Sequence, residues 1–228
     1  MSGCAGVDPA VFDEILRQAG AAAGASAPLD EKTIAAGLAE ALEVATERTV
    51  TETSRPDGYF GNARIKIPLP DEFERAASGL RSIGMGRQVD ELELTMNRAA
   101  ERAASEATPV FLNAIRQMTF SDARAILSGD DRAATTYFHG RTHAELTSRF
   151  SPIVEQSMQQ VGLVRQYNQV TALVKALPLV HAPVIDLEDY VTSRALDGLF
   201  TVLGDEEARI RDDPAARSSE LLRRVFGG

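Results

Sequence analysis

Tryptophan is absent from the chain, cysteine occurs once, and no run approaches the roughly 18 apolar residues of a membrane-spanning helix. No segment is therefore expected to cross a bilayer, and a single cysteine suits an oxidising compartment, where a second thiol invites wrong pairing. Lysine is also scarce, and the net charge is −9. Because nucleic-acid affinity rests on Lys and Arg neutralising phosphates, we expect no nucleic acid among the partners.

Aromatic residues make up only 6% of the 228 residues, and many apolar positions are alanine. Hydrophobic residues at 44% and charged residues at 25% are ordinary values for a globular protein. A chain of this length can bury a core without disulfides or metal. We therefore expect one globular domain in which small side chains let the elements pack closely.

The N-terminal residues Met1-Ser2-Gly3-Cys4 resemble the end of a bacterial lipobox, a Leu-Ser-Gly-Cys pattern with Met1 at the leucine position. In such proteins the peptide before the cysteine is removed, and the thiol takes a diacylglycerol. Residues 18–28 are rich in Ala, Gly and Ser, which is typical of a flexible tether. Residues 1–29 are thus predicted to hold a lipobox remnant, a short helix and a tether. Lipidated Cys4 would anchor a periplasmic protein to the outer membrane; the alternative is a cytosolic protein that happens to begin this way.

Helix starts are marked by an acceptor side chain followed by proline, since the acceptor suits the N-cap and the proline suits the first helical position. Such pairs are Asp8-Pro9, Thr108-Pro109, Ser151-Pro152 and Asp213-Pro214, and further caps are expected at Asp30, Ser121 and Asp186.

Apolar residues spaced three and four apart predict helices over roughly 30–53 and 87–107, before and after Pro152, before Pro178, from Asp186 and from Pro214. The apolar faces of the first two helices are Ile34, Leu38, Ala41, Ala45 and Thr49, and Val89, Leu92, Met96, Ala99 and Ala103. Residues 64–70 alternate like a short strand, and residues 179–185 form a second extended stretch. We predict a single all-α domain over residues 30–228, a bundle of about seven to nine helices. The two extended stretches could pair as a small ribbon.

Several strings resemble those of one bacterial family: Arg64-Ile-Lys-Ile-Pro-Leu-Pro70, residues 86–101, 114–119 and 186–192, Ala195-Leu-Asp-Gly-Leu-Phe200, and residues 213–217. The family is the uncharacterised domain-of-unknown-function family 4197, and the resemblance spans roughly residues 30–228. Its members look like exported or lipid-anchored helical proteins, so the resemblance implies an envelope location. It implies no activity and no catalytic residue.

His139 and His143 stand four residues apart, and on one continuous helix they could share a face as zinc ligands do. Gly140 is expected to interrupt that helix, and Thr142 to cap a new one. No Glu occupies the inner position that the HExxH motif requires. We interpret the pair as part of a solvated helix junction and expect no metal.

Other patterns of catalytic residues are missing from the sequence. It has no Glu-x-x-His motif and no Gly-x-Ser-x-Gly elbow, and Gly84-Met-Gly86 lacks the strand that precedes a phosphate-binding loop. We expect no cofactor and no enzymatic activity. Polar residues that lie on or beside apolar faces would need partners if buried, and could form an internal network or a ligand's polar anchor. They are Asn97, Arg98, Asn168 and Asp197.

The favoured function is a periplasmic lipid-anchored protein that binds or shuttles a hydrophobic ligand, a lipid, in a cavity between helices. The expected anchor and the alanine-rich helix faces motivate it, because such sites are mainly apolar with a few polar groups. The expected walls, each of which also fits a plain core, are Met96, Phe111, Ile115, Met118, Phe138, Tyr167 and Phe200, with Asn168 as the polar contact.

The alternative is a non-enzymatic interaction or scaffold lipoprotein, which holds an envelope protein partner through an exposed helical face or the loop at residues 57–62. It predicts a solid core and an exposed apolar patch. A third hypothesis, an enzyme, rests only on the His139/His143 pair and scattered carboxylates.

Overall fold

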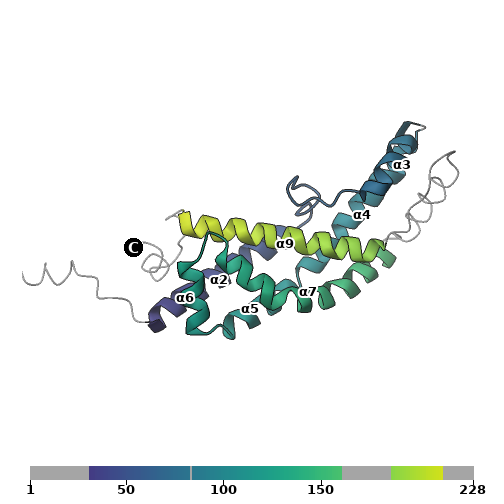
Figure 1. Ribbon diagram of the computed structural model, residues 1–228. Helices are drawn as coiled ribbons and strands as arrows, with labels where there is room; N and C mark the ends of the chain where they lie inside the picture. Colours follow the sequence, from purple (N-terminus) through teal and green to yellow (C-terminus); the bar gives the residue numbers. More distant parts are fainter. Residues whose placement is uncertain (1–30, 83, 161–185, 213–228) are drawn as a thin grey trace, which may run out of the picture.

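The computed structural model describes residues 31–82, 84–160 and 186–212. Within these ranges the chain is helical and contains no strand, which confirms the predicted all-α class (Figure 1). The helices are α2 (Glu31–Ser54), α3 (Asp71–Ser82), α4 (Gly86–Ala104), α5 (Ala107–Arg116), α6 (Phe120–Ser128), α7 (Ala133–Gln160) and α9 (Leu187–Asp212). None of these described helices is long and apolar enough to cross a bilayer.

Helix α9 packs against α7, α2 and α4, and these contacts organise the core. α7 and α9 run in opposite directions, since Glu207 contacts Ala134 while Phe200 contacts His139 and His143 farther along α7. α6 lies at the end of the molecule where α2 begins, and α3 extends away with the start of α4 at the other end (Figure 1).

The predicted apolar face of α4 is confirmed, because all five of its residues are 1% exposed or less. The face of α2 is confirmed over Leu38, Ala41, Ala45 and Thr49, which are buried, while Ile34 is half-buried. Many of these buried residues are alanines, so the helix axes can approach closely, as the composition led us to expect.

α7 is one continuous helix, so the predicted breaks at Gly140 and at Ser151-Pro152 are wrong, as is the predicted cap at Thr142. Both breakers lie on the exposed side of α7, where Pro152 costs one backbone hydrogen bond and its ring faces solvent. The opposite side is buried at intervals of four residues, and its packing outweighs the local cost. The residues of that side are Phe138, Thr142, Leu146, Phe150 and Val154.

The predicted caps have mixed outcomes. Asp186 caps α9 as predicted, since its Oδ1 accepts the N–H groups of Glu188 and Asp189 at 3.1 Å. α5 begins at Ala107 after Glu106, so Thr108 is not its N-cap. Pro109 lies instead inside the first turn, where a missing N–H leaves no helical bond unmade. The caps predicted at Asp8, Asp30 and Asp213, and the helices predicted before Pro178 and from Pro214, lie outside the described residues.

α6 is capped by Thr119 and not by Ser121. The Thr119 hydroxyl accepts the N–H of Asp122 at 3.1 Å, and the Asp122 carboxylate accepts the N–H of Thr119 at 2.9 Å. This backbone hydrogen bond lowers the pKa of Asp122 below its ordinary value. The reciprocal pair is a capping box, which the spacing Thr-x-x-Asp could have predicted.

Candidate functional site

The connection between α2 and α3 runs from residue 55 to residue 70, and we call it the 55–70 loop. It exceeds the roughly 12–15 residues beyond which connections without secondary structure are uncommon and usually functional. Three buried side chains hold the backbone of this loop in place: Tyr59, Glu101 and Asn97.

Tyr59 fastens the first half of the loop to α9. Its ring is fully buried, and its hydroxyl donates to the Ala195 carbonyl at 2.6 Å. A Cβ added at Gly198 would lie 2.6 Å from the Tyr59 ring, so only glycine allows the ring this close to α9. Burial raises the pKa of the Tyr59 phenol well above its ordinary value, and the nearby charges of Glu101 and Asp197 add to this.

Glu101 fastens the turn at residues 57–60 to α4. This carboxylate is only 4% exposed, and its Oε1 accepts the N–H groups of Tyr59 at 3.2 Å and Phe60 at 3.3 Å. Its other oxygen pairs with Arg98 at 2.6 Å, and Arg98 in turn pairs with Asp57 at 2.9 Å. Asp57 has a φ of 62°, a left-handed conformation that these contacts hold in place.

Asn97 fastens the second half of the loop to α4. The side chain is fully buried; its Oδ1 accepts the Ile67 N–H at 2.8 Å, and its Nδ2 donates to the Ile67 carbonyl at 2.8 Å. The amide thus pairs with the extended segment as a neighbouring strand would. The prediction of a strand over 64–70 is therefore wrong, and the predicted partner 179–185 lies outside the described residues.

The outer side of the loop carries a mixed set of side chains. Arg64 pairs with Asp205 on α9, and the Lys66 ammonium lies 4.5 Å from the centre of the Phe60 ring. Pro68 and Pro70 have no N–H, so this segment cannot take up a partner strand through regular ladder hydrogen bonds. A partner would therefore recognise side chains and the turn at residues 57–60. The exposed residues of the loop are Arg55, Pro56, Asp57, Gly61, Ala63, Arg64 and Pro68.

The residues predicted to line a ligand cavity partly come together in the core. The Phe111 ring lies edge-on to Phe138 at 5.1 Å and to Phe200 at 5.9 Å between centres, and Met96 and Ile115 are buried as well. Met118 is half-buried against the core. Tyr167, Asn168 and the predicted lipidation site Cys4 lie outside the described residues.

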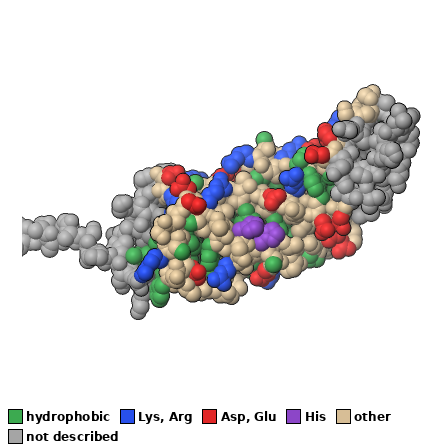
Figure 2. Space-filling view, in the orientation of Figure 1, with side chains coloured by type: hydrophobic (Ala, Val, Ile, Leu, Met, Phe, Trp, Pro, Cys, Tyr) green, Lys and Arg blue, Asp and Glu red, His purple; other side chains and the backbone are tan. Residues whose placement is uncertain are grey.

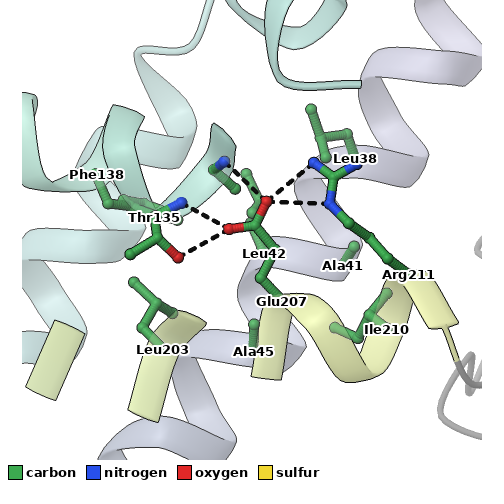
Figure 3. Close-up of a pocket in the computed structure, with 11 residues that line it drawn as sticks. Leu38, Ala41, Leu42, Ala45, Thr135, Phe138, Leu203, Glu207, Ile210 and Arg211 are labelled. Carbon is green, nitrogen blue, oxygen red and sulfur yellow. Dashed lines mark hydrogen bonds and ion pairs between the residues drawn. The ribbon is translucent and has the colours of Figure 1, made fainter. Parts of the chain in front are cut away.

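Of these residues, Phe138 lines a cavity between α2, α7 and α9, which holds only about 20 Å³ (Figure 3). That is space for about one water, far below the 300–1,000 Å³ of typical ligand sites. Glu207 points into it and accepts the N–H groups of Ala134 at 2.9 Å and Thr135 at 2.8 Å, and it also pairs with Arg211. Glu207 therefore completes the N-terminus of α7 and helps to close the core.

An apolar groove lies on the surface between the start of α2 and α6. It has a volume of about 310 Å³, and Phe120 at its rim is 53% exposed. Ile34, Ala123 and Leu127 line its apolar part. The described residues therefore combine a small cavity between α2, α7 and α9 with an apolar groove on the surface.

The titratable residues form no group of three or more His, Cys, Asp or Glu suited to a metal ion within the described ranges. Of the polar residues singled out in the sequence, Asn97 and Arg98 belong to the network that holds the loop, and Asp197 is exposed.

Sequence reasoning missed Tyr59, Glu101 and Gly198. A pattern that could have found Glu101 is its spacing from Asn97, since residues four apart on α4 lie on one face. Three of the strings that resemble the family meet at the loop: residues 64–70 through Ile67, residues 86–101 through Asn97 and Glu101, and residues 195–200 through Gly198.

Comparison with known proteins identifies the family of this chain but no individual related protein. No curated protein and no solved structure matches the chain significantly. The sequence profile of the family described as "protein of unknown function (DUF4197)" matches residues 28–227, a range that includes the 55–70 loop and its partners on α4 and α9. Since the match covers most of the chain, the protein belongs to the DUF4197 family.

Proposed function

We propose that the protein is a non-enzymatic interaction protein of the bacterial envelope, and that the 55–70 loop is the surface it offers to a protein partner. The observation that carries the proposal is the way the loop is held. A long connection without regular structure is fixed by its own buried phenol, Tyr59, which bonds to α9, and by a buried carboxylate and amide from α4.

A fixed loop suits binding because the conformational entropy of ordering it is lost during folding and not at the moment of association. Loops positioned by a rigid scaffold are also where binding residues concentrate. Here α4 and α9 form the scaffold, and the exposed side chains of residues 55–64 form the candidate contact surface.

The close packing of the interior favours this function over transport of a lipid. Phe111 contacts both Phe138 and Phe200, and the cavity beside Phe138 holds only about 20 Å³. A lipid held in the core between α2, α7 and α9 would need these helices to separate. Lipid extraction from protein purified from native membranes tests that alternative: a lipid recovered at close to one per chain would favour the carrier.

The envelope location is part of the proposal and rests on the Met1–Cys4 string and the family resemblance. Expressed behind a lipoprotein signal sequence in cells fed an alkyne fatty acid, the protein should become labelled. Cys4→Ser should abolish the label. Labelling that survives this substitution would contradict an anchor at Cys4.

The loop is tested by photo-crosslinking in cells. A photoreactive amino acid at exposed Ala63 should give a discrete adduct with a protein, and the same residue at exposed Ala144 on α7 serves as the matched control. Adding Asn97→Ala should lower the Ala63 yield several-fold, because it releases Ile67. Equal yields from Ala63 and Ala144 would refute a partner at the loop.

A further inference from the structure

His139 and His143 lie side by side on the exposed face of α7, where they form a patch near the middle of the molecule (Figure 2). The helix is continuous between them, and Gly140 adds no side chain to the space around them. We propose that this pair is a binding site for one divalent transition-metal ion, held by one imidazole nitrogen from each histidine and completed by water. The proposal is independent of the proposed function.

The spacing of the two rings matches that of two imidazoles that share a metal ion. A metal lies about 2.0–2.1 Å from each ligating nitrogen, hence about 3.2 Å from each ring centre. When the lines from the metal to the two ring centres make an angle between 90° and the tetrahedral value, the ring centres lie about 4.5–5.2 Å apart. The centres of the His139 and His143 rings are 4.7 Å apart. Rotation about the broad χ2 wells of exposed side chains can then bring the nitrogens to one point.

The surroundings hold the rings together without competing for the nitrogens. Phe200 on α9 lies 4.9 Å from the His139 ring and 6.3 Å from the His143 ring, at 15° to the plane of the latter. The basic residue nearest in sequence, Arg141, is directed elsewhere: its guanidinium lies over Tyr137 at 5.6 Å and 3.8 Å from Asp122. Because Phe200 is apolar and the Arg141 guanidinium lies against Tyr137 and Asp122, neither residue competes with a metal dication for the imidazole nitrogens.

Imidazole nitrogens select the class of metal. They suit Cu²⁺, Ni²⁺ and Zn²⁺, with Cu²⁺ bound most tightly, whereas Mg²⁺ and Ca²⁺ prefer oxygen ligands. No group of three or more His, Cys, Asp or Glu suited to a metal occurs in the described part of the chain, so two protein ligands are what this site provides. The remaining coordination positions face solvent, which makes the ion exchangeable.

The test is titration of the tag-free protein with Cu²⁺ and, separately, Ni²⁺ by calorimetry, with Mg²⁺ as the negative probe. We expect one ion per chain, and a Cu²⁺ EPR spectrum with hyperfine splitting from two nitrogens. His139→Gln and His143→Gln should each weaken binding at least tenfold, because each leaves a single nitrogen. His181→Gln is the matched control and should bind as the parent does.

Three results would overturn the site. They are unchanged affinity in both single variants, equal loss in the His181→Gln control, and no Cu²⁺ or Ni²⁺ binding by the parent. Since both rings are exposed, glutamine should leave the fold intact, which far-UV circular dichroism of each variant checks.

Discussion

Replacing Asn97 by alanine gives the sharpest test of how the 55–70 loop is held. The side chain is fully buried and supplies both hydrogen bonds of the Ile67 backbone, whose residue is also buried. Asn97→Ala leaves one N–H and one carbonyl without partners. Each such group costs about 1–3 kcal/mol, so we expect a loss of about 2–4 kcal/mol once water reaches part of the gap. That is a large share of the 5–15 kcal/mol typical of a domain.

Urea denaturation at pH 7 measures this loss as a lower midpoint with an unchanged slope. The matched control is Asn113→Ala on α5, where the amide is exposed and has one long bond from Gln117 at 3.3 Å. It should change the free energy of unfolding by less than about 0.5 kcal/mol. If Asn97→Ala costs no more than this control, the amide does not hold the loop and the reasoning fails.

Asn97→Asp separates the shape of the side chain from its hydrogen-bond pattern. The new carboxylate would face the Ile67 and Glu93 carbonyls in place of the amide N–H groups. Burial and these two oxygens would raise the pKa of the introduced carboxyl in the folded state. The folded protein then binds more protons than the unfolded chain, so stability falls as pH rises through the window above about 3.9. Asn97→Asp should thus be more stable at pH 4.5 than at pH 7 relative to Asn97→Ala at the same pH values.

Three further predictions concern the contacts around the loop and α7. Gly198→Ala should lower thermal stability by a net 1–2 kcal/mol, roughly, because overpacking against Tyr59 exceeds the gain in helix propensity; an unchanged melting temperature would contradict this. Burial raises the pKa of Tyr59, so the folded protein keeps a proton that the unfolded chain releases above about pH 10. Parental stability should therefore fall between pH 9 and 11 more steeply than that of Tyr59→Phe, and parallel urea curves at both pH values would exclude it. Glu207→Gln should cost about 2–4 kcal/mol in urea denaturation, since it removes the charge opposite Arg211 and one acceptor at the start of α7; hydrogen exchange should rise first at Ala134, and unchanged protection there would argue against the cap.

The helical class could be predicted from sequence because the buried faces of α2 and α4 follow the helical period closely. The continuity of α7 could not be predicted, because the helix propensities of glycine and proline give only a local cost of about 1 and 3 kcal/mol. Whether a helix continues through them depends on the buried face opposite. Phe150 and Val154 flank Pro152 and are both fully buried, so the packing on that side holds the helix together.

The helix junction predicted at the histidine pair was wrong for the same reason. The interpretation of the pair as a solvated junction depended on Gly140 ending a helix, and the glycine lies in fact on an exposed side where nothing approaches it. Once α7 is continuous, the spacing of four residues places the rings on one face. A local pattern is therefore informative about a site only when the element that carries it is known.

The 55–70 loop lay beyond prediction because its partners come from distant parts of the chain. Glu101 and Asn97 lie on α4 and Ala195 on α9, and the alternation over 64–70 gave no indication that a side-chain amide would replace a neighbouring strand. A polar residue on a helix face can be recognised from sequence, but the backbone group it serves cannot. Asn97 was recognised in this way as a candidate for a network, whereas its partner Ile67 could not be.

The arrangement of the loop also determines how binding can be separated from folding. Substitutions at the anchors change stability and loop conformation together, so a loss of partner binding in Asn97→Ala alone would be ambiguous. Ala63 is exposed, and Arg64 makes its charge contact with Asp205 on the surface of α9. Exposed ion pairs contribute little to stability, so Arg64→Ala should leave unfolding nearly unchanged. A partner that binds the loop should lose affinity for Arg64→Ala, or for a variant with a bulky residue at Ala63, while the fold stays intact. A partner that binds elsewhere should keep its affinity for both variants.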